Sequence, residues 1–354
     1  MHNIKYKALI TVCMRGEANM SNLTRDFFYG LSKNKFLNEN AKRWGFRLGA
    51  EKFVAGIDLE SVTKVIKELN RHGITGTIDN LGEFVSDKRE ATQAKNEIIR
   101  ILDRIYEENL DCHLSIKITQ LGLDIDQDFC LANVREIVET ADRYDIFVNI
   151  DMEDYSRYEK TLEVLDVLRY DFDNIGTVMQ SYLFRADDDL DQLEDVRIRI
   201  VKGAYKEDPS VAYQSKVDID RNFISLAKKR LLGNTFTSIA THDHNIINEL
   251  KLFVKENNIS HDKFEFQMLY GFRKEMQYEL AREGYHFCTY IPFGTDWFGY
   301  YMRRIAERPQ NLGIVAKDVF YTNDNKLKKE PIIGGAVALS LVYLLRKSRK
   351  KKDK

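Results

Sequence analysis

The feature that most constrains the fold of this chain is a regular alternation of short apolar runs with longer charged segments, from about residue 74 onward. Runs rich in β-branched and aromatic residues predict strands, and segments with helical spacing predict helices. The strand-like runs are residues 73–81, 112–121, 146–152, 175–184, 196–203, 237–243, 263–269 and 286–294, with helical segments such as 88–109, 134–144, 213–232, 245–257 and 274–283 between them. Eight strands that each precede a helix predict an α/β chain folded as a (β/α)8 TIM-like barrel.

The remaining segments set the predicted domain organisation. Residues 1–70 lack the repeat and have a mainly helical pattern, so we expect an N-terminal helical arm there. We place the barrel at 71–322, close to the about 250 residues typical of this fold, and a linker, a short apolar helix and a basic tail at 323–354. A doubly wound sheet is the structural alternative, but neither GxGxxG nor GxxxxGK occurs, which weakens it.

Composition excludes several classes of function. The 354 residues carry a net charge of −1, but residues 346–354 hold seven basic and one acidic side chain, so the body of the chain is acidic. An acidic body argues against a nucleic-acid partner. The four cysteines form no CxxC pair, which suits reduced thiols in a cytosol, and the short apolar run ALITVCM does not resemble a signal peptide. We therefore expect a cytoplasmic protein.

Polar residues gather at the predicted carboxyl ends of the strands, where (β/α)8 barrels build their active sites. Each one alone is compatible with a structural ion pair, but their convergence at one mouth predicts a binding site. They are Asp79, Lys117, Asp151 with Glu153, Gln180, Arg199 with Lys202, Thr241 with His242, Gln267 with Tyr270, and Tyr290.

Two other kinds of catalytic site find little support. The sequence His242-Asp243-His244 has the spacing of zinc ligands, but His72, His113 and His286 precede or begin their strands, at the wrong end of the barrel. We therefore predict no metal. A serine hydrolase is not supported either, because no GxSxG motif is present.

Two segments favour a ligand with an anionic or electron-rich group. In RIVKGAY, residues 199–205, small residues follow a basic strand end and allow a ligand close to the backbone. The alternative is a turn at the edge of the barrel. In YYMRRIAERP, residues 300–309, helical spacing places Tyr300, Arg303, Arg304 and Glu307 on one stripe. Two guanidinium groups suit a planar carboxylate, although a charged face turned to water is the alternative.

Several motifs, in this order along the chain, resemble those of the flavin-dependent proline dehydrogenases, both the single-function bacterial enzymes and the corresponding domain of bifunctional proline utilisation A. They are FVAGIDLESVTKVIKELNRHGITGTIDNLGE, SIKITQLG, VNIDMED, VMQSYLFR, VRIRIVKGAY, IATHD, FEFQMLYG, YIPFGTDWFGYYMRR and RIAERPQN. The resemblance covers roughly residues 50–320. It implies a distorted (β/α)8 barrel with FAD at the strand tops. It also implies an enzyme that oxidises L-proline to 1-pyrroline-5-carboxylate and passes the electrons to a quinone.

The resemblance also implies roles for individual residues. Asp151 and Arg199 match catalytic positions. The substrate positions are Lys117, Tyr290, Tyr300, Arg303, Arg304 and Glu307. The FAD positions are Met179, Gln180, Arg199, Lys202, Gly203, Ala204, Thr241, His242 and Gln267. Lys206 departs from the pattern, because the bifunctional enzymes have a tryptophan there.

The C-terminal tail predicts contact with a membrane. Residues 331–345 are apolar and precede a basic end, but a full span needs about 20 apolar residues. We expect peripheral, tail-mediated attachment to the inner face of the cell membrane, with a packed soluble helix as the alternative. Two other functions remain open: a flavin barrel of the methylenetetrahydrofolate reductase type, and a catalytically silent, membrane-tethered binding barrel.

Overall fold

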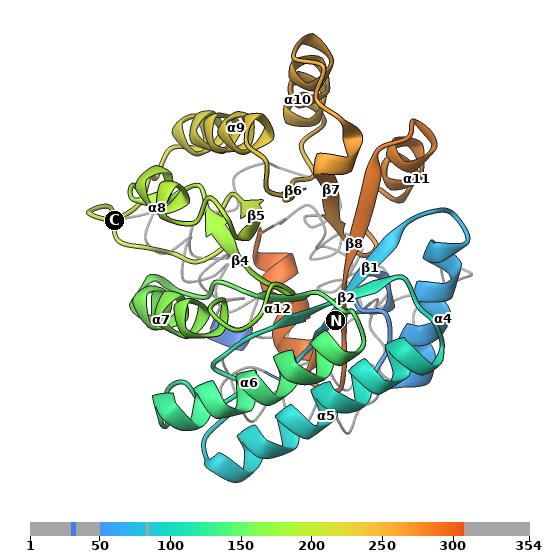
Figure 1. Ribbon diagram of the computed structural model, residues 1–354, viewed down its shortest axis with the longest axis vertical. Coiled ribbons are helices and arrows are strands. Elements are labelled where there is room, and N and C mark those ends of the chain that lie inside the picture. Colours follow the sequence, from blue (N-terminus) through green and yellow to red (C-terminus); the bar gives the residue numbers. More distant parts are fainter. Residues whose placement is uncertain (1–29, 33–49, 83–84, 308–354) are drawn as a thin grey trace, which may run out of the picture. The chain divides into compact units, whose positions relative to one another are not determined.

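The computed structural model describes residues 30–32, 50–82 and 85–307 (Figure 1). The chain divides into two compact units, one of which is Val54–Thr295 and the other Met1–Phe53 together with Asp296–Lys354. The boundaries that the sequence suggests, after residues 70 and 322, stay predictions.

The unit Val54–Thr295 contains a closed barrel of eight parallel strands in sequence order. The strands are β1 (Thr75–Asn80), β2 (Cys112–Ile116), β3 (Val148–Ile150), β4 (Ile175–Gln180), β5 (Arg197–Val201), β6 (Thr237–Ala240), β7 (Phe264–Leu269) and β8 (His286–Phe293). Closure comes from β8, which pairs with β1 over six residue pairs from Thr75 with Cys288 to Asn80 with Phe293. The predicted (β/α)8 barrel is therefore confirmed.

Helices of the same unit surround the strands (Figure 1). They are α4 (Leu59–Asn70), α5 (Lys88–Glu107), α6 (Gln127–Arg143), α7 (Tyr158–Leu168), α8 (Ala186–Gln192), α9 (Lys216–Leu232), α10 (His244–Glu256) and α11 (Lys274–Arg282), with short 3-10 turns η2 (Tyr155–Arg157) and η3 (His261–Lys263). Four begin at an aspartate, Asp58, Asp87, Asp126 or Asp243, whose side chain accepts a hydrogen bond from a backbone N–H of the first turn. Such a cap contributes about 1 kcal/mol, so the chain itself fixes these helix starts.

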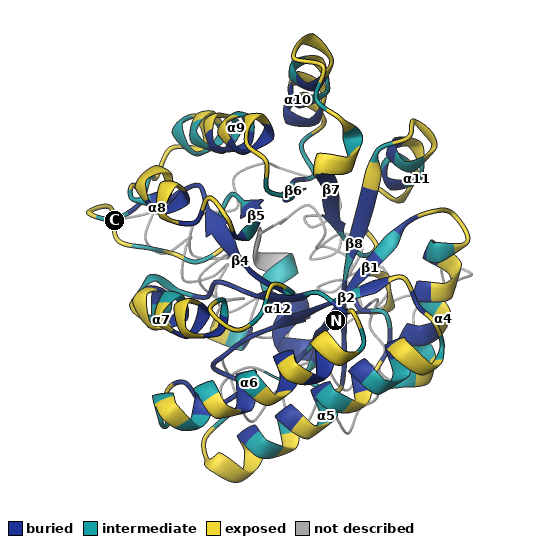
Figure 2. Cartoon of the chain, in the orientation of Figure 1, coloured by how far each residue is buried: buried dark blue, intermediate teal, exposed yellow. Residues whose placement is uncertain are grey.

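The apolar core lies between the strands and the helices. All six residues of β4 are buried, and α5 buries Ile98, Ile101, Leu102 and Ile105 along one face. Figure 2 shows the strands as buried and the outer faces of the helices as exposed. Strands of a parallel barrel are covered on both faces, so polar residues of these strands, such as Asp79 and Arg199, are buried as well.

All eight strands are shorter than the runs that the sequence predicts, and in two of them a turn sets the end. The strand predicted at 112–121 ends at Ile116, because Gln120 N donates to Lys117 O at 3.1 Å and a turn begins. The strand predicted at 175–184 ends at Gln180 for a similar reason, with Leu183 N donating to Gln180 O at 3.1 Å. Both turns leave polar residues at the carboxyl rim of the barrel.

In the other unit, the described elements are residues 30–32, η1 (Ala50–Lys52) and α12 (Trp297–Glu307). The Tyr301 ring lies 6.1 Å from both Phe53 and Trp297, centroid to centroid. Among the described residues, no helix combines the length and the apolar character needed to cross a membrane. Most of the predicted N-terminal arm and the whole predicted tail lie outside the described residues.

Candidate active site

A cluster of charged and phenolic side chains occupies the carboxyl end of the barrel interior. Lys117 Nζ lies 2.7 Å from Asp79 Oδ1, 3.4 Å from Asp151 Oδ2 and 3.2 Å from the Tyr290 hydroxyl. Arg199 donates to Asp151 Oδ1 at 2.7 Å, and Tyr290 donates to Asp151 Oδ2 at 2.7 Å. Two cations face two carboxylates, so the cluster is electrically balanced although it is buried.

Arg199 is held from several sides. Besides Asp151, its guanidinium donates to Ser115 Oγ at 2.8 Å and contacts Thr77 Oγ1 at 3.4 Å. Its central carbon lies 5.2 Å from the centre of the Tyr290 ring. Asp151 therefore contacts both Lys117 and Arg199 and is placed to orient both side chains.

Asp79 belongs to this cluster; the sequence names it among the polar strand ends, but the family resemblance assigns it no role. It is 1% exposed and its distance to Lys117 is shorter than that of Asp151. The sequence signal was its place at the carboxyl end of the first strand. Spacing alone could not rank it above the other polar strand ends.

The two carboxyl groups titrate in opposite directions. Burial raises the pKa of Asp79, and although Lys117 opposes this, Asp151 adds to it. Burial also acts to raise the pKa of Asp151, but Lys117 and Arg199 outweigh it and the pKa lies below its ordinary value. Burial and then the two carboxylates raise the pKa of Tyr290 well above the usual value for a phenol. Asp151 is thus a stable carboxylate at neutral pH and Tyr290 a stable hydrogen-bond donor.

The predicted cofactor residues follow neighbouring strands. Met179 and Gln180 end β4, Lys202, Gly203 and Ala204 follow β5, Thr241 and His242 follow β6, and Gln267 lies in β7. His242 Nε2 accepts from Leu269 N at 3.0 Å, which leaves the ring proton of the neutral form on Nδ1. Lys202 lies 2.5 Å from Asp220 and 3.5 Å from Asp243, so two carboxylates already engage it.

The backbone conformation and the surroundings of position 203 require glycine. Its φ angle is +105°, and a Cβ atom there would lie 2.6 Å from the Tyr182 ring. A side chain at this position would be strained and would also displace Tyr182. Glycine at position 203 therefore allows the segment after β5 to pack closely against Tyr182 at the rim of the barrel.

Two buried glutamines present unpaired acceptors. Gln180 Nε2 donates to Met152 O at 3.3 Å and to Glu153 O at 3.1 Å, and Gln267 Nε2 donates to Glu265 Oε1 at 2.6 Å. Because only the NH₂ group can donate, these bonds fix which end of each amide is oxygen. Both Oε1 atoms are buried without a hydrogen-bond partner in the part of the chain that the structure describes. A buried acceptor without a donor is costly, so these atoms point to a ligand with N–H or O–H groups.

One group of residues has metal-like spacing but another role. Ligand atoms of His113, Glu265 and Cys288 lie within 4.8 Å of one another. Glu265 Oε1, however, lies 3.1 Å from Arg197, and burial raises the pKa of Cys288 well above its usual value. Burial lowers the pKa of His113 to about 4. A neighbouring cation and a protonated thiol disfavour metal binding, and we assign this group to the packing of the barrel.

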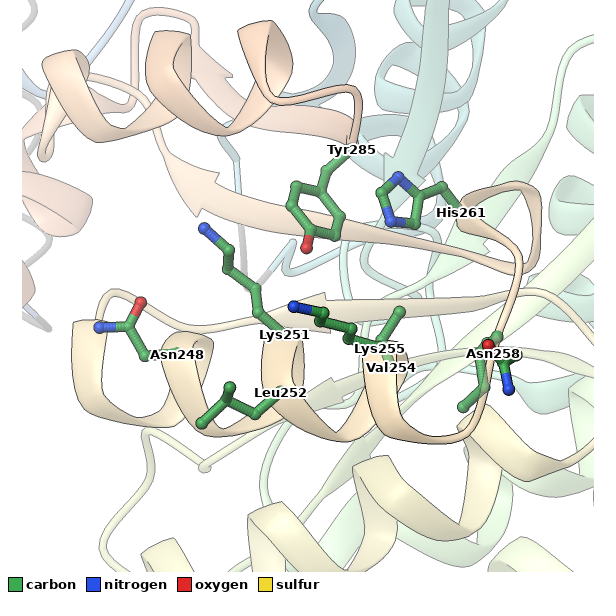
Figure 3. Close-up of a pocket in the computed structure, with 9 residues that line it drawn as sticks. Asn248, Lys251, Leu252, Val254, Lys255, Asn258, His261 and Tyr285 are labelled. Carbon is green, nitrogen blue, oxygen red and sulfur yellow. The ribbon is translucent and has the colours of Figure 1, made fainter.

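A pocket of 720 Å³ lies elsewhere on the barrel unit (Figure 3). It is lined by Asn248, Lys251, Leu252, Val254, Lys255, Asn258, Ile259, His261 and Tyr285. His261 precedes β7 and Tyr285 precedes β8, so this pocket is at the amino ends of the strands. None of the predicted site residues lines it, and amino-end residues usually serve stability.

The predicted arginine pair lies on α12, which confirms the predicted helix. Tyr300 is 5% exposed, and the central carbon of the Arg304 guanidinium lies 5.0 Å from the centre of its ring. Arg303 and Arg304 are partly buried. The Glu307 side chain lies outside the described residues, so its role beside the arginines stays a prediction, as does a joint site of α12 and the strand ends.

Comparison with known proteins identifies the family. The sequence model described as proline dehydrogenase matches residues 62–317. Proline dehydrogenase 1 of Bacillus subtilis (strain 168) is 47% identical over 299 residues, which are 84% of this chain and 99% of that protein. Proline dehydrogenase of Deinococcus radiodurans is 41% identical over 283 residues, which are 78% of this chain and 90% of that protein.

A solved structure shows the same fold. Proline utilization A from Bdellovibrio bacteriovorus, inactivated by N-propargylglycine, superposes with a TM-score of 0.72 at 22% identity. The match covers 89% of this chain but only 40% of that much longer one. At this identity the likeness to the solved structure shows the fold alone. The family match and the identity to the two curated relatives show more: the chain belongs to the proline dehydrogenase family, and it is an oxidoreductase.

Proposed function

We propose that this chain oxidises L-proline to 1-pyrroline-5-carboxylate with hydride transfer to FAD and onward electron transfer to a membrane quinone, as the first step of proline catabolism. Family membership supports the oxidation of proline. The observation that carries the cofactor is the pair of buried, unpartnered Oε1 atoms of Gln180 and Gln267, within the described residues, on strands β4 and β7.

The residues at the strand ends fit a flavin. Its ring N–H and its ribityl hydroxyls are the donors that the two glutamine oxygens lack. Gly203 lets the segment after β5 pack against Tyr182, and the neutral His242 with Thr241 adds polar groups after the next strand. We assign Met179, Gln180, Gly203, Ala204, Thr241, His242 and Gln267 to cofactor binding. The assignment of Lys202 is weaker, since Asp220 and Asp243 already engage it.

Arg199 has the charge and the rigidity for a role at the reacting centre. It is 5% exposed and fixed by Asp151 and Ser115. A preorganised cation stabilises negative charge that develops next to it, at no cost of reorganisation during the reaction. When bound, the flavin supplies the two-electron acceptor, and the chain supplies orientation and charge.

The substrate residues suit a proline zwitterion. Arg303 and Arg304 would hold its carboxylate, with Glu307 offsetting their mutual repulsion, and Tyr300 and Tyr290 would cover the ring. Oxidation removes a hydride from C5 and a proton from the nitrogen, and the C5–N bond becomes double. Of the three groups in the network of Tyr290, Asp151 and Lys117, only the Asp151 carboxylate lacks a proton, so it would relay the nitrogen proton to water.

Two other functions are less well supported. A reductase of the methylenetetrahydrofolate type does not call for an arginine pair on the last helix, and the family match is to proline dehydrogenase. A silent binding barrel would have no reason to keep the balanced cluster of Asp79, Lys117, Asp151 and Arg199, because a buried charge network is costly to maintain.

Anaerobic titration tests the proposal. The purified full-length protein should be yellow, release FAD on denaturation, and lose its visible absorbance when L-proline is added. D-proline serves as the control, because the carboxylate of the mirror-image substrate would be misplaced. A colourless protein that cannot be reconstituted with FAD, or a flavin that L-proline leaves oxidised, would overturn it.

A further inference from the structure

Glu265 lies inside the barrel, below the active-site cluster, and contacts three donors. It is 3% exposed, and its Oε1 accepts from Ser238 Oγ at 2.6 Å, from Gln267 Nε2 at 2.6 Å and from Arg197 at 3.1 Å. Ser238 is its register partner on β6, and Gln267 is two residues ahead on the same face of β7. No step of the proposed reaction uses this carboxylate.

The counter-ion of Glu265 is immobilised. The central carbon of the Arg197 guanidinium lies 4.1 Å from the Phe147 ring centre and 4.3 Å from that of Phe236. Rings at these distances hold a cation by cation–π attraction. Burial would raise the pKa of Glu265, but Arg197 and the other donors lower it below its ordinary value. Glu265 is therefore a fixed carboxylate.

A carboxylate at this position allows only one orientation of the neighbouring amide. An ionised Glu265 can only accept hydrogen bonds, so Gln267 must turn its NH₂ group toward it. Gln267 Oε1 is then directed away from Glu265, and it is a buried acceptor without a partner in the described part of the chain. An amide without this constraint could rotate by about half a turn and present a donor instead.

We propose that Glu265 is a positioning residue that fixes the amide of Gln267, so that Gln267 Oε1 accepts a hydrogen bond from an N–H or O–H group of the flavin. This inference rests on the proposed function, because it needs a flavin. Glu265 does not touch the flavin itself. In Glu265→Gln the new side chain could either donate or accept, so it would also permit the flipped orientation of Gln267, in which Gln267 Oε1 accepts from the new NH₂ group and the Gln267 NH₂ group faces the flavin.

A double-mutant cycle tests the proposal on the full-length holoenzyme. The variants are Glu265→Gln, Gln267→Met and the two combined, and the probe is FAD released on serial dilution, measured by its fluorescence. Each single substitution should raise the FAD dissociation constant about tenfold or more, as loss of one good hydrogen bond implies. The double variant should be no weaker than Gln267→Met alone. Losses that multiply would overturn the proposal, because Glu265 would then act independently of Gln267.

Ser238→Ala is the matched control, because it removes one donor from the same carboxylate and leaves the bond to Gln267. It should lower the unfolding temperature while the FAD dissociation constant changes less than about twofold. The visible spectrum of bound flavin should shift in Glu265→Gln and stay unchanged in Ser238→Ala. Equal loss of FAD in both variants would overturn the positioning role in favour of general destabilisation.

Misfolding of Glu265→Gln and absence of FAD from the wild-type protein can each be distinguished from failure of the positioning role. If Glu265→Gln does not fold, Glu265→Asp takes its place in the cycle, because it keeps the charge opposite Arg197 and withdraws the carboxylate from Gln267. A wild-type protein that holds no FAD would overturn the proposed function and this inference together. A wild-type protein that holds FAD and is reduced by L-proline, with losses that multiply, would overturn the inference alone.

Discussion

Arg199 and Asp151 lie at the centre of the polar cluster inside the barrel. Their 2.7 Å contact is buried, and each also bonds a second element: Arg199 contacts Ser115 on β2 and Asp151 contacts Tyr290 on β8. A buried pair of this kind adds little net stability, but removing one partner leaves an uncompensated charge. We propose that the ion pair serves catalysis, because it holds the Arg199 charge in position before the substrate binds.

The arginine pair of α12 gives a prediction on substrate binding. Arg303→Met or Arg304→Met should raise the KM for L-proline at least tenfold, because loss of one partner of a desolvated charge pair costs about 2 to 5 kcal/mol. FAD content should stay near normal. Steady-state kinetics and the flavin-to-protein ratio measure the two effects.

Arg282→Met is the control for that experiment. Arg282 is an exposed arginine near the end of α11, outside the proposed site, so its loss should leave KM unchanged. Unchanged kinetics in both α12 variants would show that those arginines only face water.

Among the elements, the segment after β5 is conformationally restricted at Gly203. The positive φ of Gly203 and its closeness to Tyr182 leave no room for a side chain. Lys202, just before it, is held by carboxylates from α9 and from the start of α10. A segment fixed in this way at the strand ends offers a cofactor a preorganised surface.

Gly203→Ala should therefore reduce both stability and FAD content. The backbone strain alone costs about 1 to 3 kcal/mol, and displacement of Tyr182 should disturb the cofactor site. Gly284→Ala is the matched control, because Gly284 also has a positive φ, of +85°, but has open space around it at the amino end of β8. Thermal unfolding and flavin absorbance of both variants are the measurements; retention of full FAD content by Gly203→Ala would contradict the cofactor assignment of this segment.

For the molecule as a whole, we propose that the C-terminal tail brings the enzyme to its electron acceptor at the membrane. Residues 331–354 lie outside the described residues, and their membrane attachment is a proposal that rests on an apolar run followed by seven basic residues. An anionic leaflet attracts such an end by roughly 1 kcal/mol per basic residue. The run is short for a span, so shallow insertion assisted by charge is the proposed mode.

Removal of residues 331–354 should leave the reduction of FAD by proline intact, because every assigned site residue lies at or before Glu307. Turnover with quinone embedded in vesicles should fall, and the truncated protein should no longer float with anionic vesicles. Salt distinguishes the modes, since electrostatic docking weakens at high ionic strength and an inserted helix resists it. Flotation of both proteins at low and high salt is the measurement; identical behaviour would remove the membrane role.

The sequence by itself determined the eight strands, their order and the identity of the residues at their carboxyl ends. These follow from local patterns, namely apolar runs and helical spacing. The start of α6 was missed, because the helix predicted at 134–144 begins at Gln127, after its cap Asp126. Local signals of this kind span only a few residues, so they can be recognised without knowledge of the tertiary contacts. The family motifs fall on the same residues, which is why Asp151, Arg199 and Gln267 could be named before the fold was known.

Only the tertiary structure decided which of these residues meet and in which direction their side chains point. Tyr290 and Asp151 are 139 positions apart in sequence, and Arg199 and Thr77 are 122 apart, so closure of the barrel alone brings them together. Spacing could not show that Asp79 is the near partner of Lys117, nor that Glu265 turns the amide of Gln267. Those outcomes depend on distances and free donors across the barrel interior, which no stretch of sequence contains.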